Sequence, residues 1–205
     1  MIYADKNTGV IVCGATGNQG SFHIDRMNQY ARSVGGRGVV AGVTPGKGGQ
    51  EVHGVPVYDS ILKAARAKDA SAAVLFVPGS AAGDSIMEAA DAGLELVVAI
   101  TEHIPVHDVM KAVTYAEVRG CTVIGPNCPG LFSPGEISMG IMPAHLATRG
   151  QVGVISRSGT LTYEVVHELT RAGIGQSSII GIGGDPIIGQ TFADALERFA
   201  DDPLT

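Results

Sequence analysis

A glycine-rich turn between an apolar strand and a helix is the feature that most limits how this chain can fold. The apolar run Val10–Cys13 leads directly into Gly14, Gly17 and Gly20, which are spaced by three residues. Glycine allows a sharp turn and a close approach of backbone to ligand, and the following helix directs free amides and its positive dipole end at an anion. The pattern predicts a Rossmann-like α/β fold that binds a nucleotide or another phosphate-bearing cofactor.

Composition narrows the class of protein. The chain has 205 residues, of which 45% are hydrophobic and 17% charged, enough for one sizeable domain or for one complete domain and part of another. A net charge of −6 without any Lys/Arg-rich run argues against nucleic acid or an anionic membrane as the main partner. No apolar run is long enough to span a membrane and no signal-peptide pattern is present, so we expect a cytoplasmic protein. Three widely spaced cysteines indicate free thiols rather than disulfides, and no spacing suits a metal site.

Short β-branched runs alternate with stretches of helical periodicity. This alternation predicts a parallel sheet with helices on both faces, built by residues 1–125. The strands are expected at 9–13, 38–43, 72–77, 95–100 and 121–124, and the helices at 18–33, 60–68, 81–92 and 107–119.

Residues 126–150 are rich in proline and glycine and are predicted to form a loop-rich linker. Alternation resumes in 151–205, with strands at 151–156 and 177–182 and helices at 160–172 and 190–200. Parallel α/β domains usually carry about four to six strands. The second domain is therefore predicted to be incomplete, with an exposed apolar sheet edge along the strand at 177–182.

The loop after the second strand reads Thr44-Pro45-Gly46-Lys47-Gly48-Gly49. An NAD-binding Rossmann domain is expected to carry Asp or Glu at this strand tip, and none is present. A lysine between glycines instead offers a charge and open backbone amides to a phosphorylated ribose or a diphosphate. A mobile surface lysine in a glycine-rich turn is the alternative.

Further polar residues follow the strands that come later in the chain. Thr101 and Glu102 end the fourth strand, at the edge where parallel sheets bind ligands, although Thr101 could instead cap a helix. In the second domain, Ser158, Gly159 and Thr160 lie between a strand and a helix and predict an anion site at the helix N-terminus. An N-cap role for Ser158 is the alternative. None of the six histidines has a neighbouring acid or cysteine that would indicate catalysis.

Seven motifs in this order closely resemble the α subunits of succinyl-CoA synthetase, and the resemblance covers essentially the whole chain. The motifs are DKNT at 5–8, TGNQG at 16–20, GVTPGKGG at 42–49, ITE at 100–102, GPNCPG at 125–130, SRSGTLTYE at 156–164 and GIGGDP at 181–186. The resemblance implies a Rossmann-like CoA-binding domain followed by an incomplete flavodoxin-like domain. It also implies that coenzyme A is bound by Thr16, Gly17, Asn18, Gln19, Lys47, Ile100, Thr101, Glu102 and Cys128.

The resemblance further implies that Tyr163 contacts the carboxylic acid and that Ser158–Thr160 hold a phosphate. Members of the family join an acid to CoA through an acyl phosphate and a phosphorylated histidine, and an ATP-grasp β subunit binds ATP or GTP with magnesium. In the family that histidine follows a glycine well after the Asp-Asp-Pro stretch, and this sequence ends at Thr205 before it. We therefore expect no catalytic residue, and no histidine phosphorylation, in these 205 residues.

Other functions remain open at this point. A paralogue that activates another acid, such as a malate–CoA ligase, carries similar motifs. A non-catalytic CoA-binding module is a second alternative. An NAD(P)-dependent oxidoreductase is a third, and the missing acidic residue after the second strand argues against it.

Overall fold

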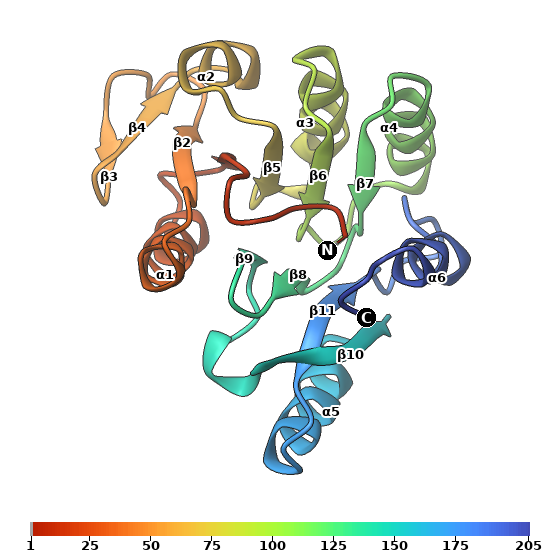
Figure 1. Cartoon of the computed structure of the whole chain (residues 1–205). Helices are drawn as coiled ribbons and strands as arrows, with labels where there is room; N and C mark the ends of the chain where they lie inside the picture. Colours follow the sequence, from red (N-terminus) through yellow and green to blue (C-terminus); the bar gives the residue numbers. More distant parts are fainter. Residues whose placement is uncertain (1) are drawn as a thin grey trace.

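The computed structural model describes residues 2–205, so Met1, the first residue of the predicted 1–125 domain, lies outside the described residues. Two sheets form the framework (Figure 1). The first has seven strands in the order β3-β4-β2-β1-β5-β6-β7, and the second has four in the order β10-β11-β8-β9. The strands of the first sheet are β1 (Val10–Cys13), β2 (Val39–Val43), β3 (Glu51–Val52), β4 (Val55–Tyr58), β5 (Ala72–Leu75), β6 (Leu96–Ala99) and β7 (Thr122–Ile124).

The first sheet is parallel except at one edge, where β3 pairs antiparallel with β4. The chain runs from β1 outward to β2 and β4, then returns to β5 on the other side of β1 and continues to β6 and β7. The strand order thus reverses between β1 and β5. In open α/β sheets, ligands bind at such a reversal, outside the carboxyl ends of the strands.

Alternating side chains of the strands build two apolar layers. Ile11 on β1 faces the layer that α2, α3 and α4 cover, whereas Val12 faces α1 and the second sheet. Figure 1 shows these three helices above the first sheet, with α1 and the second sheet below it. The helices are α1 (Asn18–Val34), α2 (Ile61–Lys68), α3 (Gly79–Asp91), α4 (Val106–Val118), α5 (Gly159–Arg171) and α6 (Phe192–Ala200).

The predicted linker 126–150 contains regular structure, which corrects the sequence-based expectation. Strands β8 (Gly130–Ser133) and β9 (Ile137–Gly140) form an antiparallel hairpin, and a 3₁₀ turn, η1 (Ala144–Leu146), follows. Each strand has four residues, β8 lies between Pro129 and Pro134, and β9 follows Gly135 and ends in Gly140, so the sequence pattern resembles a loop.

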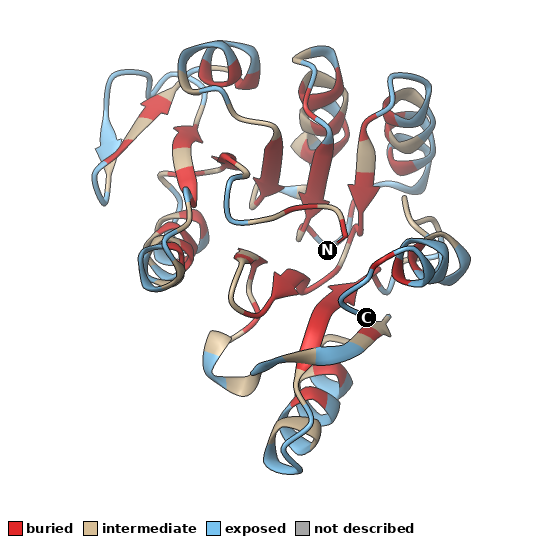
Figure 2. Ribbon diagram, viewed as in Figure 1, coloured by how far each residue is buried: buried red, intermediate tan, exposed pale blue. Residues whose placement is uncertain are grey.

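The hairpin also changes the second sheet. Strand β11 (Gln176–Gly181) pairs with β10 (Arg149–Ser156) on one side and antiparallel with β8 on the other. It is buried along its whole length, so the exposed edge predicted for 177–182 is wrong. The edge strands are β10 and β9, and Figure 2 shows the exposed residues of β10 and of the outer face of α5.

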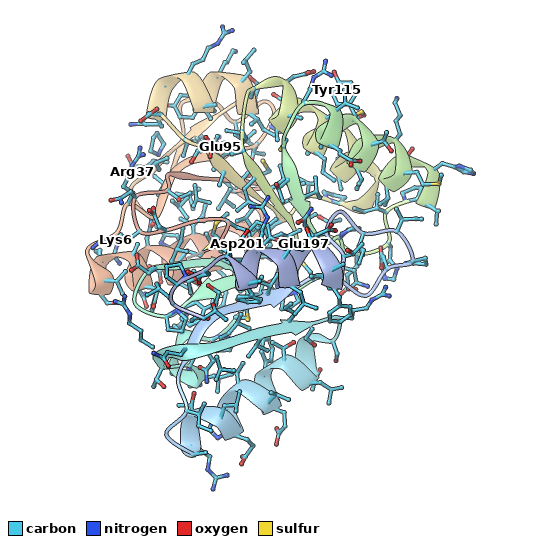
Figure 3. All side chains as sticks on the ribbon, turned by 45° about the vertical axis from the view of Figure 1, so that its right-hand side comes forward. Lys6, Arg37, Glu95, Tyr115, Glu197 and Asp201 are labelled. Carbon is cyan, nitrogen blue, oxygen red and sulfur yellow. The ribbon has the colours of Figure 1, made fainter. Side chains whose placement is uncertain are left out.

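One apolar core joins the two parts of the chain. Phe199 on α6 belongs to the cluster that contains Val12 and Ile180, and a Cβ at Gly153 of β10 would lie 2.7 Å from its ring. Figure 3 shows α6, with Glu197 on it and Asp201 at its C-cap, between the two sheets. Among the described residues, no helix is both long and apolar enough to cross a membrane.

Candidate functional site

The glycine turn after β1 has the geometry that its sequence predicts. Gly14 has a positive φ of 81°, and a Cβ there would lie 2.8 Å from the carbonyl oxygen of Phe76. A Cβ at Gly20 would lie 2.2 Å from the carbonyl oxygen of Gly14. The turn therefore closes tightly on itself and against β5, and any side chain at either position would open it.

The N-terminus of α1 is free of side-chain caps. Gly17 occupies the N-cap with an extended backbone and offers no oxygen to the first amides of the helix. Gly17, Asn18 and Gln19 are all exposed, and no acidic residue lies in the first turn. Free amides and the positive end of the helix dipole thus face solvent at the strand reversal, as an anion site requires.

Thr16 connects this turn to the loop after β2. Its backbone N–H donates to Thr44 Oγ1 at 3.3 Å, and its hydroxyl lies 3.2 Å from the same oxygen. The Thr44 hydroxyl in turn donates to the carbonyl of Val43 at 2.9 Å. Sequence reasoning did not single out Thr44, whose position at the carboxyl end of β2 was the available signal.

The Lys47 loop differs from its sequence-based prediction in one respect. The amides of Gly46 and Gly48 are not open, because both donate to Asp59 Oδ1, at 3.1 and 2.9 Å. Lys47 itself donates its amide to Thr44, and its side chain forms no ion pair with any described residue. The loop is therefore held by Asp59 and presents the exposed ammonium of Lys47 as its available group.

The Ile100–Glu102 segment follows β6 at the same edge. The Thr101 hydroxyl is buried and donates to the carbonyl of Val77 at 2.8 Å, and α4 starts later with Pro105 at its N-cap. Thr101 is thus no helix cap. Ile100 is half-buried, and Glu102 is exposed with His103 Nε2 at 3.8 Å.

The Gly125–Gly130 loop joins the two sheets. The Asn127 amide donates to the carbonyl of Thr101 at 3.0 Å, and its side-chain nitrogen donates to Asp185 Oδ1 at 2.9 Å. Cys128, which the resemblance places among the CoA contacts, is 5% exposed, and its thiol donates to the carbonyl of Ala99. Burial raises the pKa of Cys128 to about 12. Its side chain therefore packs in the core, so the structure does not support a direct contact with CoA.

The predicted anion site falls on the turn before α5. Ser158 is the N-cap, and its hydroxyl accepts a bond from the Leu161 amide at 3.3 Å, so the capping alternative is correct. Gly159 has open space where a Cβ would stand, and Thr160 is exposed. The turn is accessible. Ser158 caps the Leu161 amide, which leaves the other amides of the first turn available to an anion.

Arg157 is a residue that sequence reasoning missed. Its guanidinium donates to the carbonyls of Gly183 at 3.0 Å and Gly184 at 3.1 Å, and also to that of Asp185. These bonds hold the glycine-rich loop after β11 beside the start of α5. Asn127 binds Asp185 from the other side, so contacts run from Thr101 through Asn127 and Asp185 to Arg157.

Tyr163 lies on α5 one turn beyond this site. Its ring is half-buried against Phe132, Met142 and Val166, and burial raises the pKa of its phenol. The phenol is therefore neutral at physiological pH and can donate a hydrogen bond.

Comparison with known proteins identifies the family. The CoA binding domain family matches residues 5–103, and the CoA-ligase family matches residues 155–205. Among solved structures, ATP citrate lyase from Methanothrix soehngenii, in complex with citrate and coenzyme A, superposes with a TM-score of 0.88 at 25% identity over 99% of this chain and 35% of that one. PH0766 from Pyrococcus horikoshii superposes with a TM-score of 0.80 at 25% identity, over 98% of this chain and 46% of that one.

Curated relatives are much closer in sequence. An ADP-forming succinate–CoA ligase subunit alpha 2 from Archaeoglobus fulgidus is 54% identical over the whole chain, which covers 69% of that relative. The ADP-forming α subunit from Methanothermobacter thermautotrophicus is 53% identical, again over the whole chain and 68% of the relative. The chain thus spans about two thirds of the length of these relatives. At this identity and coverage, the chain belongs to the family of succinate–CoA ligase α subunits.

Proposed function

We propose that this chain forms the CoA-binding part of an ADP-forming succinate–CoA ligase, which converts succinate, CoA and ATP to succinyl-CoA, ADP and phosphate. The observation that carries the proposal is the uncapped, exposed N-terminus of α1 at the strand reversal, together with Lys47, which forms no ion pair with a described residue, in the loop after the neighbouring strand β2. Curated relatives with this sequence pattern bear the name of that ligase.

The described residues fit coenzyme A, which carries a diphosphate and a ribose phosphate. The first amides of α1, at Asn18 and Gln19, can donate to the diphosphate, and Lys47 can neutralise one phosphate charge. Ile100 offers an apolar surface beside the buried Thr101, which holds the strand ends in place. The bound CoA supplies a thiol that attacks the activated acid.

The remaining roles follow from the second sheet. We assign the carboxylic acid to Tyr163, whose neutral phenol can donate to a carboxylate, and a transferred phosphate to the turn at Ser158–Thr160. An ATP-grasp β subunit binds the nucleotide with magnesium, and the complex acts in the cytoplasm. The α subunit names of the relatives support a β partner.

Calorimetric titration with CoA tests the central assignment. Lys47→Ala should weaken CoA binding about tenfold, because it removes one charge-assisted contact. Lys111→Ala is the matched control, since this exposed lysine lies on α4, and it should bind CoA like the original chain. Unchanged CoA affinity in Lys47→Ala contradicts the assignment.

Dephospho-CoA identifies which phosphate Lys47 contacts. If Lys47 contacts the diphosphate, Lys47→Ala should weaken the binding of CoA and of dephospho-CoA by the same factor. If Lys47 contacts the ribose phosphate, Lys47→Ala should weaken the binding of CoA only. NADP is the competing ligand. Tighter binding of NADP than of CoA would favour the oxidoreductase alternative.

A further inference from the structure

A cavity of about 460 Å³ lies along one side of α1, from Phe22 in its second turn onward. We call it the α1 groove. One wall is α1 from Phe22 to Tyr30, and the other is the segment 138–145, which comprises the end of β9 and the chain that follows it. Its volume falls within the range of small-molecule sites, which is roughly 300–1,000 Å³.

The walls of the α1 groove are mainly apolar. Phe22, Ile141, Met142 and Pro143 are among the lining residues, and Phe22 is 52% exposed. Such a surface binds the hydrocarbon part of a ligand, because covering it removes apolar area from water.

The charge in the groove has one sign. Arg26 is the one lining residue of fixed charge, and its guanidinium lies 5.3 Å from the centre of the Phe22 ring. No carboxylate lines the groove among the described residues, and Asp25, the adjacent acid on α1, accepts a hydrogen bond from Gln29 at 2.6 Å. The groove is therefore complementary to a single negative charge.

Tyr30 and His23 also line the groove, and each can form a further hydrogen bond. Tyr30 accepts a bond from the Gly135 amide at 2.6 Å, and its own hydroxyl proton has no acceptor among the described residues. His23 is only 9% exposed, and its ring stacks on Phe76 at 5.1 Å between centroids. No described residue forms a hydrogen bond with the His23 ring, and the ring lines the groove. The ring nitrogens therefore offer a donor or an acceptor at the wall of the groove.

We propose that the α1 groove binds a small monocarboxylate with an apolar body. The carboxylate pairs with Arg26 and accepts from Tyr30, while the hydrocarbon lies against Met142 and Phe22. One guanidinium matches one carboxylate in a bidentate pair. A phosphate dianion would leave charge uncompensated beside apolar walls. This site goes beyond the proposed function, in which CoA occupies the edge of the first sheet.

Octanoate is the probe, and isothermal titration with the 205-residue chain is the measurement. Saturable binding at one site is expected, with inorganic phosphate showing none and 1-octanol binding at least tenfold more weakly. Arg26→Gln should weaken octanoate about tenfold, whereas Arg32→Gln, in the last turn of the same helix and outside the groove, should leave it unchanged. Absence of saturable binding, or equal loss in both variants, overturns the proposal.

A second variant keeps the test independent of surface charge. Ala144→Trp places a large side chain in the groove, and it is the only tryptophan of the chain. Its fluorescence should resemble that of a half-buried indole, and octanoate affinity should fall at least tenfold while CoA affinity stays unchanged. Octanoate binding that survives in Ala144→Trp, or that saturating CoA abolishes in the original chain, refutes the site.

Discussion

Gly20→Ala tests whether the tight turn after β1 positions the N-terminus of α1. The new Cβ would lie 2.2 Å from the Gly14 carbonyl oxygen and 2.8 Å from its carbonyl carbon. Real Cβ contacts are not shorter than 3.0 Å, so the turn and the helix must separate by about 0.8 Å. Overpacking of this kind costs about 1–3 kcal/mol. Both overlapping atoms are backbone atoms and cannot rotate away, so we expect a loss of about 3 kcal/mol in the free energy of unfolding. The higher helix propensity of alanine offsets about 1 kcal/mol of this loss.

The net loss of about 2 kcal/mol should lower the Tm by about 6 °C in a chain of this size. Calorimetry on the same variant should show CoA affinity reduced at least tenfold, because the first amides of α1 move with the turn. Gly159→Ala is the matched control: it lies in the first turn of α5 with nothing within 4 Å of the added Cβ, so its Tm should stay the same or rise and its CoA affinity should be maintained. A Gly20→Ala variant with unchanged Tm and CoA affinity would refute the reasoning.

Four further predictions follow from individual contacts and from the burial of the thiols. Arg157→Gln should speed amide hydrogen exchange in the loop 183–189 at least tenfold and leave the first sheet unaffected, because three carbonyls lose their donor. Thr191→Ala should cost about 1 kcal/mol and lower the Tm by about 3 °C, since Thr191 caps α6. Hydrogen bonds from Thr191 hold the pKa of Asp194 below its usual value, so this carboxylate stabilises the fold above about pH 4 and stops doing so as the pH falls through its lowered pKa. The stability difference between Asp194→Asn and the original chain, measured by urea unfolding, should therefore shrink from pH 7 to pH 3. Burial raises the pKa values of all three thiols, to about 11 for Cys121, so a thiol reagent at pH 8 should label none of them until urea unfolds the chain.

The sequence determined the main elements of the first sheet and the glycine turn. The predicted strands and helices lie within about two residues of those observed, because each has a strong apolar period that the chain satisfies locally. The positive φ of Gly14 and the N-terminus of α1 follow from residues next to one another in the chain. The sequence also predicted that Lys47 and Thr101 lie at one edge of the sheet, because each follows a strand and parallel strands end at the same edge.

Tertiary structure alone decided which groups are free and which are occupied. The amides around Lys47 are bound by Asp59, the Cys128 thiol is bound by the carbonyl of Ala99, and Arg157 binds a loop some 26 residues away in the chain. The hairpin β8–β9 forms because β11 offers it a partner, although its own residues pattern as a loop. Such pairings join distant residues, and their free energy depends on burial and geometry that appear only when the chain has folded.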